Sequence, residues 1–83
     1  MKELVEYIVK ALVDNPDKIE VKETAGDYVT ILEVRTAPED VGKVIGREGR
    51  IANSLRSIAK AAAAKQNKKI TVEIITDEER PAG

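Results

Sequence analysis

Apolar residues recur at helical spacing near the start of the chain. Across residues 3–13 they fall on one side of a helix. Asn15 precedes Pro16 and ends this helix, because a residue before proline avoids the helical region. We expect Tyr7 at the edge of the core. The predicted stripe consists of Leu4, Val5, Ile8 and Leu12, flanked by Val9 and Val13.

The next stretches alternate between apolar and polar residues, which is typical of β-strands. Residues 18–23 place Ile19 and Val21 on one face, and residues 28–35 are rich in β-branched side chains. The short turn at residues 24–27 predicts an antiparallel hairpin, with residues 28–35 as the central strand of a sheet. A third strand is expected at residues 70–76.

Two helices are expected between the second and third strands. Thr36 and Glu39 fit a capping box at the start of a short helix over residues 38–45. A long helix follows over residues 50–66, favoured by four consecutive alanines at residues 61–64. Helix propensity alone explains these alanines, and a surface for self-association is the alternative. The predicted stripe of the long helix consists of Ile51, Leu55, Ile58, Ala59 and Ala62.

The order α-β-β-α-α-β predicts an α+β fold. The two helices form a crossover between the strands at residues 28–35 and 70–76, so these strands should be parallel neighbours. Three helices would then cover one face of a three-stranded mixed sheet. We expect a single domain over residues 1–78 and a flexible C-terminal tail over residues 79–83, which ends in Pro-Ala-Gly.

The composition excludes several classes of protein. The 83 residues include neither cysteine nor histidine, so the chain lacks thiolate metal ligands, disulfides and the commonest general base. No P-loop pattern occurs and no buried pair of acids stands out, so we expect neither an enzyme nor a cofactor or metal site. No apolar run approaches about 20 residues and no signal-peptide core is present, so a cytoplasmic protein without a membrane partner is expected.

The net charge of −1 conceals a strong asymmetry. Residues 41–60 hold five basic side chains against one acid, a charge of +4, which leaves −5 for the rest of the chain. Such a field orients an anionic partner onto one face of a protein. We interpret Lys60 and Lys65 as part of a solvated helix face, whereas Arg47 and Arg50 lie beside a pair of glycines.

Gly46 and Gly49 lie three residues apart between the two predicted helices. Glycine tolerates positive φ and adds no Cβ, so another backbone can approach it closely. The helix that starts next to Gly49 offers unpaired N–H groups, which favour a phosphate. A lone G-x-x-G pattern is also consistent with a tight connection between helices and nothing more.

The stretch VGKVIGREGR, in this order of elements, resembles the type II K-homology (KH) domain over nearly the whole chain. The resemblance implies binding of single-stranded RNA, with about four nucleotides against the G-x-x-G loop. It also implies a role as an RNA chaperone or post-transcriptional regulator. The strand at residues 70–75 would form the second wall of the groove. The implied RNA-binding residues are Lys43, Val44, Ile45, Gly46, Arg47, Glu48, Gly49, Arg50, Ile51, Asn53 and Ser54.

Two features modify the expected affinity. Glu48 places an acid where many KH loops carry a basic or neutral residue, so it should repel phosphate, unless it caps the following helix instead. The chain has no phenylalanine or tryptophan on which bases could stack. We therefore expect weak, salt-sensitive binding. The implied aliphatic floor for the bases consists of Val44, Ile45, Ile51 and Leu55.

Two other functions are consistent with the pattern. A DNA-binding helix-turn-helix also uses two helices and a glycine-bearing turn, but here its recognition helix would carry four alanines and the strands would have no role. The other alternative is a protein-interaction module. For that module the resemblance implies a homodimer or a heterodimer with a larger KH-containing protein.

Overall fold

The computed structural model describes residues 1–75, and the expected order of elements is confirmed within them. Short 3-10 turns precede β1, α2 and α3. The predicted tail at residues 79–83 and the last residue of the predicted third strand lie outside the described residues. The elements are α1 (Lys2–Leu12), β1 (Glu20–Ala25), β2 (Val29–Arg35), α2 (Val41–Ile45), α3 (Arg50–Ala64) and β3 (Lys69–Ile75).

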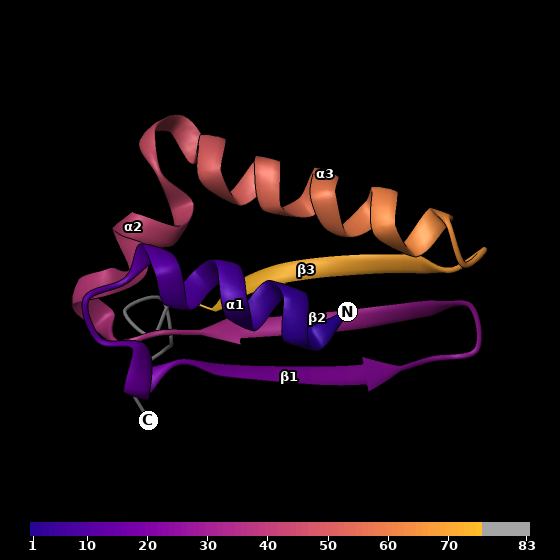
Figure 1. Ribbon diagram of the computed structural model, residues 1–83, viewed down its shortest axis with the longest axis horizontal. Coiled ribbons are helices and arrows are strands. Elements are labelled where there is room, and N and C mark those ends of the chain that lie inside the picture. The colour runs from indigo at the N-terminus through magenta and orange to yellow at the C-terminus, as the bar shows by residue number, and fades with distance from the viewer. Residues whose placement is uncertain (76–83) are drawn as a thin grey trace, which may run out of the picture.

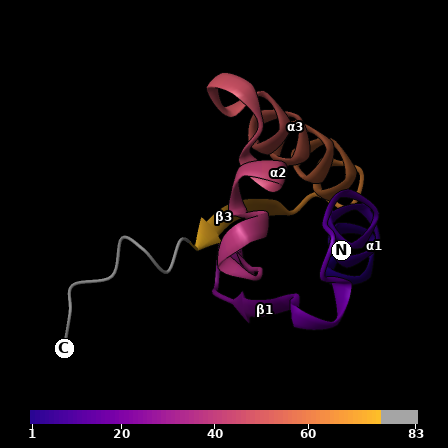
Figure 2. The ribbon, with the colours of Figure 1, turned by 90° about the vertical axis from the view of Figure 1, so that its left-hand side faces the viewer.

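The three strands form one mixed sheet in the order β1-β2-β3. β1 and β2 are antiparallel, with Val21 opposite Val34, whereas β2 and β3 are parallel, with Leu32 opposite Val72. The hairpin, the parallel pair and the central position of β2 are therefore confirmed. α1 packs on β1 and α3 packs on β3, so that the helices lie on one face of the sheet (Figures 1 and 2).

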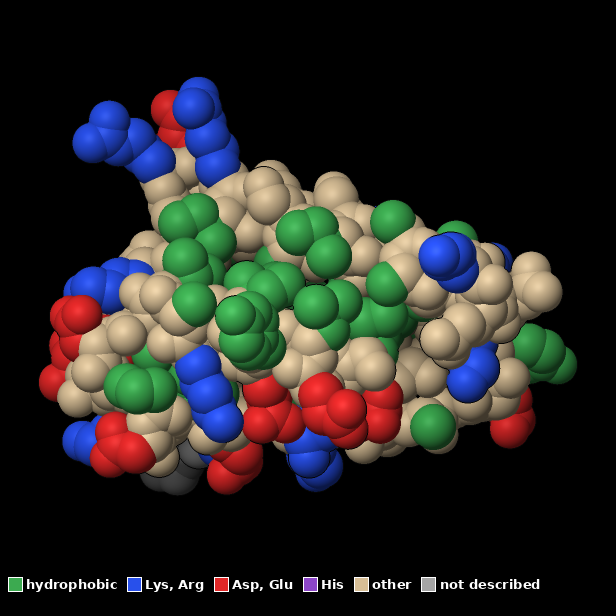
Figure 3. All heavy atoms as spheres, viewed as in Figure 1, with side chains coloured by type: hydrophobic (Ala, Val, Ile, Leu, Met, Phe, Trp, Pro, Cys, Tyr) green, Lys and Arg blue, Asp and Glu red, His purple; other side chains and the backbone are tan. Residues whose placement is uncertain are grey.

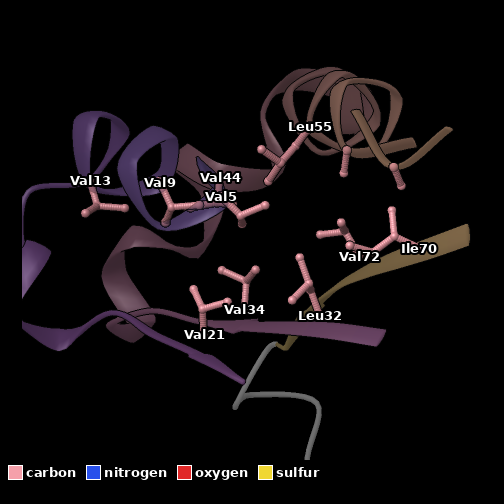
Figure 4. Packing of buried hydrophobic residues seen from close by; sticks show 12 residues of the cluster. Val5, Val9, Val13, Val21, Leu32, Val34, Val44, Leu55, Ile70 and Val72 are labelled. Carbon is pink, nitrogen blue, oxygen red and sulfur yellow. The ribbon is translucent and has the colours of Figure 1, made fainter. Parts of the chain in front are cut away.

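The core lies between this sheet face and the helices (Figure 4). Alternate residues of β2, Leu32 and Val34, are fully buried there, as period-two alternation requires. The core cluster is formed mainly by small and β-branched residues. Its members are Val5, Val9, Val13, Val21, Leu32, Val34, Val44, Leu55, Ala59, Ala63, Ile70 and Val72.

The buried side of α1 differs from the predicted stripe. Val5 and Val9 are fully buried, whereas Leu4 is 39% exposed and Tyr7 is 76% exposed. The prediction that Tyr7 lies at the core edge is wrong. Apolar residues cover a broad sector of this helix, so the sequence left open which side would face the sheet.

The buried side of α3 is also rotated from the predicted stripe. Ala52, Leu55, Ala59 and Ala63 are buried, whereas Ile58 is 47% exposed. Small alanine side chains let the backbone of α3 lie close to the sheet, and this places the larger Ile58 towards solvent. The prediction that Ile58 belongs to the core is wrong.

Asp40 joins the end of α1 to the start of α2. Its side chain is fully buried and accepts hydrogen bonds from the backbone N–H groups of Asp14 (3.3 Å) and Asn15 (3.0 Å). The side-chain amide of Asn15 donates a third, at 3.0 Å. Burial would raise the pKa of Asp40, but these hydrogen bonds and the ammonium group of Lys43 outweigh it and hold the pKa below its ordinary value.

The predicted capping box before α2 does not form. The hydroxyl of Thr36 donates to the carbonyl of Ala37 at 3.1 Å, and no side chain caps this helix start. Asp40 instead uses its carboxylate to bind the loop after α1. Among residues 1–75, no helix is long and apolar enough to cross a bilayer.

Candidate nucleic-acid interface

The connection between α2 and α3 is a tight turn with left-handed backbone. Gly46, the C-cap of α2, has φ 76°, and Gly49, the N-cap of α3, has φ 74°. Between them Glu48 also has positive φ, at 55°. The Gly46 N–H donates to the Gly42 carbonyl at 2.8 Å, and the Gly49 N–H donates to the Gly46 carbonyl at 3.2 Å. The predicted tight turn between two helices is confirmed.

The start of α3 is open to a ligand. No side chain forms a cap hydrogen bond there, so the alternative in which Glu48 caps this helix is wrong. The first N–H groups of a helix have no intrahelical acceptor and carry a partial positive charge. The N–H groups of Gly49 and Arg50 already donate to the carbonyls of Gly46 and Arg47, so the donors for an anionic oxygen come from the next residues in the first turn of α3.

Two arginines of the turn differ in their surroundings. Arg47 is exposed and forms no ion pair within residues 1–75. The Nη2 atom of Arg50 lies 3.8 Å from Oε2 of Glu48, and both side chains are largely exposed. Figure 3 shows basic side chains that project from the upper left of the molecule with an acidic one between them. Figure 1, in the same view, places this loop there. Glu48 partly neutralises Arg50 and leaves Arg47 as the available cation.

Lys43 lies in a different environment. Its Nζ atom is 3.2 Å from Oδ2 of Asp14 and 3.8 Å from Oδ1 of Asp40. These carboxylates belong to the junction between α1 and α2. The structure therefore does not bring the charge of Lys43 together with those of Arg47 and Arg50.

The predicted aliphatic floor is only partly accessible. Val44 is fully buried in the core and Leu55 is nearly so. A base cannot touch them without displacing their neighbours, so they support the surface from beneath. Ile45 and Ile51 are half-buried and keep an accessible side.

Asn53 and Ser54 lie exposed on the first turns of α3, as a polar contact surface requires. The Ser54 hydroxyl donates to the Arg50 carbonyl at 2.9 Å, a bond within its own helix. The side-chain oxygen of Asn53 accepts a hydrogen bond from Nη1 of Arg56 at 3.1 Å. Both polar groups are therefore engaged, although each keeps further hydrogen-bonding capacity.

Arg56 spans the seam between α3 and β3, and the sequence did not predict this. Its Nε donates to the backbone carbonyl of Val72 at 3.1 Å while Nη1 holds Asn53. β3 is an edge strand of the sheet, so some of its carbonyls have no partner strand. The arginine lies between the two walls that the KH resemblance assigns to an RNA groove. The sequence contains a signal for the contact between Arg56 and Asn53, because residues three apart lie on the same side of a helix.

Comparison with known proteins gives one consistent result. Residues 2–74 match the family model described as "KhpA/KhpB, KH domain". A protein of Clostridium perfringens named "RNA-binding protein KhpA" is 57% identical over 75 residues, which cover 90% of this chain and all of the relative.

More distant relatives carry the same name. The protein of Borreliella burgdorferi is 48% identical over 73 residues, which cover 88% of this chain and 89% of the relative. The protein of Aquifex aeolicus is 44% identical over 75 residues, which cover 90% of this chain and 95% of the relative. No solved structure gives a significant match.

Proposed function

The chain belongs to the KhpA/KhpB family of KH domains, and from this membership we propose that it binds single-stranded RNA. KH domains clamp about four nucleotides of RNA backbone with their G-x-x-G loop. In this chain that loop is Gly46 to Gly49, at the end of α2 and the start of α3. The curated relatives are themselves named RNA-binding proteins.

One observation carries the proposal: glycines with positive φ bracket a turn that ends on an uncapped helix start. A phosphate approaching this turn meets the N–H groups of the first turn of α3, no Cβ at either glycine, and the Arg47 guanidinium, which has no ion pair within residues 1–75. These features together favour a sugar-phosphate backbone over a neutral ligand. A tight helix connection alone would not need an exposed arginine beside the helix start.

The proposed contact residues follow the predicted set and differ in role. The backbone of residues 46–49 and the Arg47 side chain hold the phosphates, and Ile45 and Ile51 offer aliphatic surface to a base. Asn53 and Ser54 supply hydrogen bonds at the start of α3, with Val44 as support from the core. Arg50 contributes charge reduced by Glu48, and Lys43 contributes to the wider field.

This site has few cations and no aromatic platform, so we expect weak affinity that falls steeply with salt. Such binding suits an RNA chaperone or a post-transcriptional regulator that contacts many transcripts briefly. The proposed compartment is the cytoplasm, where such transcripts are found. We propose no catalytic step, because the sequence lacks the histidine and cysteine that most often perform one.

Amide-shift mapping with a short single-stranded RNA tests the site. We expect the largest shifts at the glycine amides of residues 46–49 and in the first turn of α3. Shifts confined to the hairpin of β1 and β2 would refute the assignment. An Arg47→Asp variant should lose most of the affinity, and Lys22→Asp, with the same charge change on β1, is the matched control.

Competition between RNA and duplex DNA tests the helix-turn-helix alternative. At equal salt, single-stranded RNA should displace duplex DNA from the protein, and duplex DNA should not displace RNA. The sheet agrees with this expectation, because α3 packs along β3 and a helix-turn-helix gives the strands no role.

A second candidate function is self-association, for which Ile58 is the candidate contact residue. Nearly half of this large apolar side chain is exposed on α3, next to the alanine-rich end of the helix. A second copy, or the KH domain of a larger partner in the same KhpA/KhpB family, would cover it. Light scattering of Ile58→Glu against the control Ser57→Glu tests the homodimer. A wild type that is monomeric at high concentration would contradict it.

A further inference from the structure

A hollow of about 400 Å³ lies at the end of α3 that is remote from the glycine turn. Its floor is apolar, with Val29, Ala64 and Ile70, and Thr71 lies beside them. Its basic rim combines the last turns of α3 with the start of β3. The basic side chains that line it are Lys60, Lys68 and Lys69.

The lysines of this hollow have acidic neighbours outside it, since Glu23 and Asp27 line adjoining pockets that share Lys68 and Lys69. No acidic residue lines the hollow itself, and within residues 1–75 none of its three lysines forms an ion pair. Neighbouring lysines repel one another, so three lysines around a hollow that no acid lines favour an anionic ligand there. The interpretation of Lys60 as simply part of a solvated face does not account for this grouping around an apolar floor.

The hollow and the glycine turn are joined by the seam between α3 and β3. α3 has 15 residues, so the two ends are separated by about 22 Å at 1.5 Å per residue. α3 contains no acidic residue, and Arg56 lies between the ends with its guanidinium on the Val72 carbonyl.

We propose that this hollow is a second contact site for the same RNA strand, beyond the nucleotides held at the turn. The strand follows the seam, passes Arg56 and places a phosphate between Lys60 and Lys68, with a base against Val29 and Ala64. Lysine ammonium groups on flexible stems suit phosphates whose positions vary. The inference rests on the proposed function, and it extends the footprint from one end of α3 to the other.

RNA length separates this inference from the proposed function. Affinities are measured for an RNA of about four nucleotides, which the turn alone accommodates, and for one about twice as long. Three proteins are compared over a range of salt: wild type, Lys60→Gln with Lys68→Gln, and the control Lys18→Gln with Lys22→Gln. Both double variants lose two positive charges, and all four lysines are exposed.

We expect wild type and the control to bind the longer RNA more tightly than the shorter one. The Lys60 and Lys68 variant should lose that gain and keep its affinity for the short RNA. Its salt slope for the longer RNA should fall by roughly 0.7 for each phosphate that is no longer neutralised by a lysine. Unchanged thermal unfolding would show that the substitutions leave the fold intact.

Equal affinity of wild type for both lengths would overturn the inference while leaving the proposed function standing. Equal losses in both double variants would overturn it too, because the effect would then be general charge. An acidic peptide that binds wild type but not the Lys60 and Lys68 variant, with no effect of RNA length, would assign the hollow to a protein partner. If neither RNA binds wild type, the proposed function fails as well.

Discussion

Ile51 occupies the space that a side chain at Gly46 would need. A Cβ built on Gly46 would lie 2.6 Å from Cγ1 of Ile51, closer than real Cβ atoms approach a neighbour. Gly49 is different, because the nearest atom to its Cβ would be Nδ2 of Asn53 at 4.0 Å. Packing and backbone conformation both require the first glycine of the turn, whereas backbone conformation alone requires the second.

Gly46→Ala is therefore expected to destabilise the protein more than Gly49→Ala. Left-handed backbone costs a residue with a Cβ about 1–2 kcal/mol, and overpacking against Ile51 adds about 1–3 kcal/mol at position 46. Urea denaturation measures both. Gly42→Ala, in α2 with no atom within 4 Å of the added Cβ, is the control, and it should stabilise by about 0.5–1 kcal/mol. Equal costs at positions 46 and 49 would contradict the packing argument.

Glu48→Gln should strengthen RNA binding. The substitution frees Arg50 from the carboxylate 3.8 Å away and removes a negative charge from the loop. Exposed pairs of this kind contribute about 0.2–1 kcal/mol, so the affinity should rise up to about five-fold at low salt. Fluorescence anisotropy with a labelled single-stranded RNA measures the change, and Glu23→Gln on β1 controls for net charge. A gain that persists unchanged at high salt would argue against an electrostatic cause.

Arg56→Lys should destabilise the protein although it keeps the charge. A lysine cannot hold the Val72 carbonyl and the Asn53 side chain at once, because it lacks the planar fork of donors. We expect a loss of about 1–2 kcal/mol in the free energy of unfolding, as for hydrogen bonds that involve a charged group. Arg47→Lys, which has no such partners within the described residues, is the matched control and should leave stability unchanged. Similar stabilities of the two variants would show that the bridge contributes little.

The order of elements could be predicted because local signals agreed with the fold. Alternation marked β1, β-branched residues marked β2, and proline and glycine marked the ends of helices. The crossover required β2 and β3 to be parallel. Gly46 and Gly49 were recognisable because only glycine adopts their backbone conformation without strain. Each of these signals depends on residues that are close together in the chain, so a single sequence is enough to detect them.

The remaining errors concern the way elements pack against one another. In α1, Val9 rather than Leu4 faces the sheet. In α3, Ala52 rather than Ile58 does so. The elements packed against each helix set its rotation, so the sequence of the helix alone does not determine it. Hydrophobic periodicity identifies the apolar sector of a helix, but it does not show which part of that sector faces the core. Contacts between distant residues, such as that of Arg56 with Val72, leave no pattern along the chain.

The carboxylate of Asp40 should make stability depend on pH below about 5. Its folded pKa lies below the ordinary value of an aspartate, so the folded state binds the proton less readily than the unfolded state. The stabilisation is therefore fully present above the unfolded pKa and is lost as pH falls through the folded pKa. Asp40→Asn should lower stability at pH 7, where wild type has this contribution, and the two proteins should converge as the pH falls through the folded pKa of Asp40. Urea midpoints across this pH range measure the convergence, with Asp17→Asn as the control for loss of a nearby exposed carboxylate. A constant difference between wild type and Asp40→Asn across that range would mean that the ionised form of Asp40 is not what binds Asp14 and Asn15.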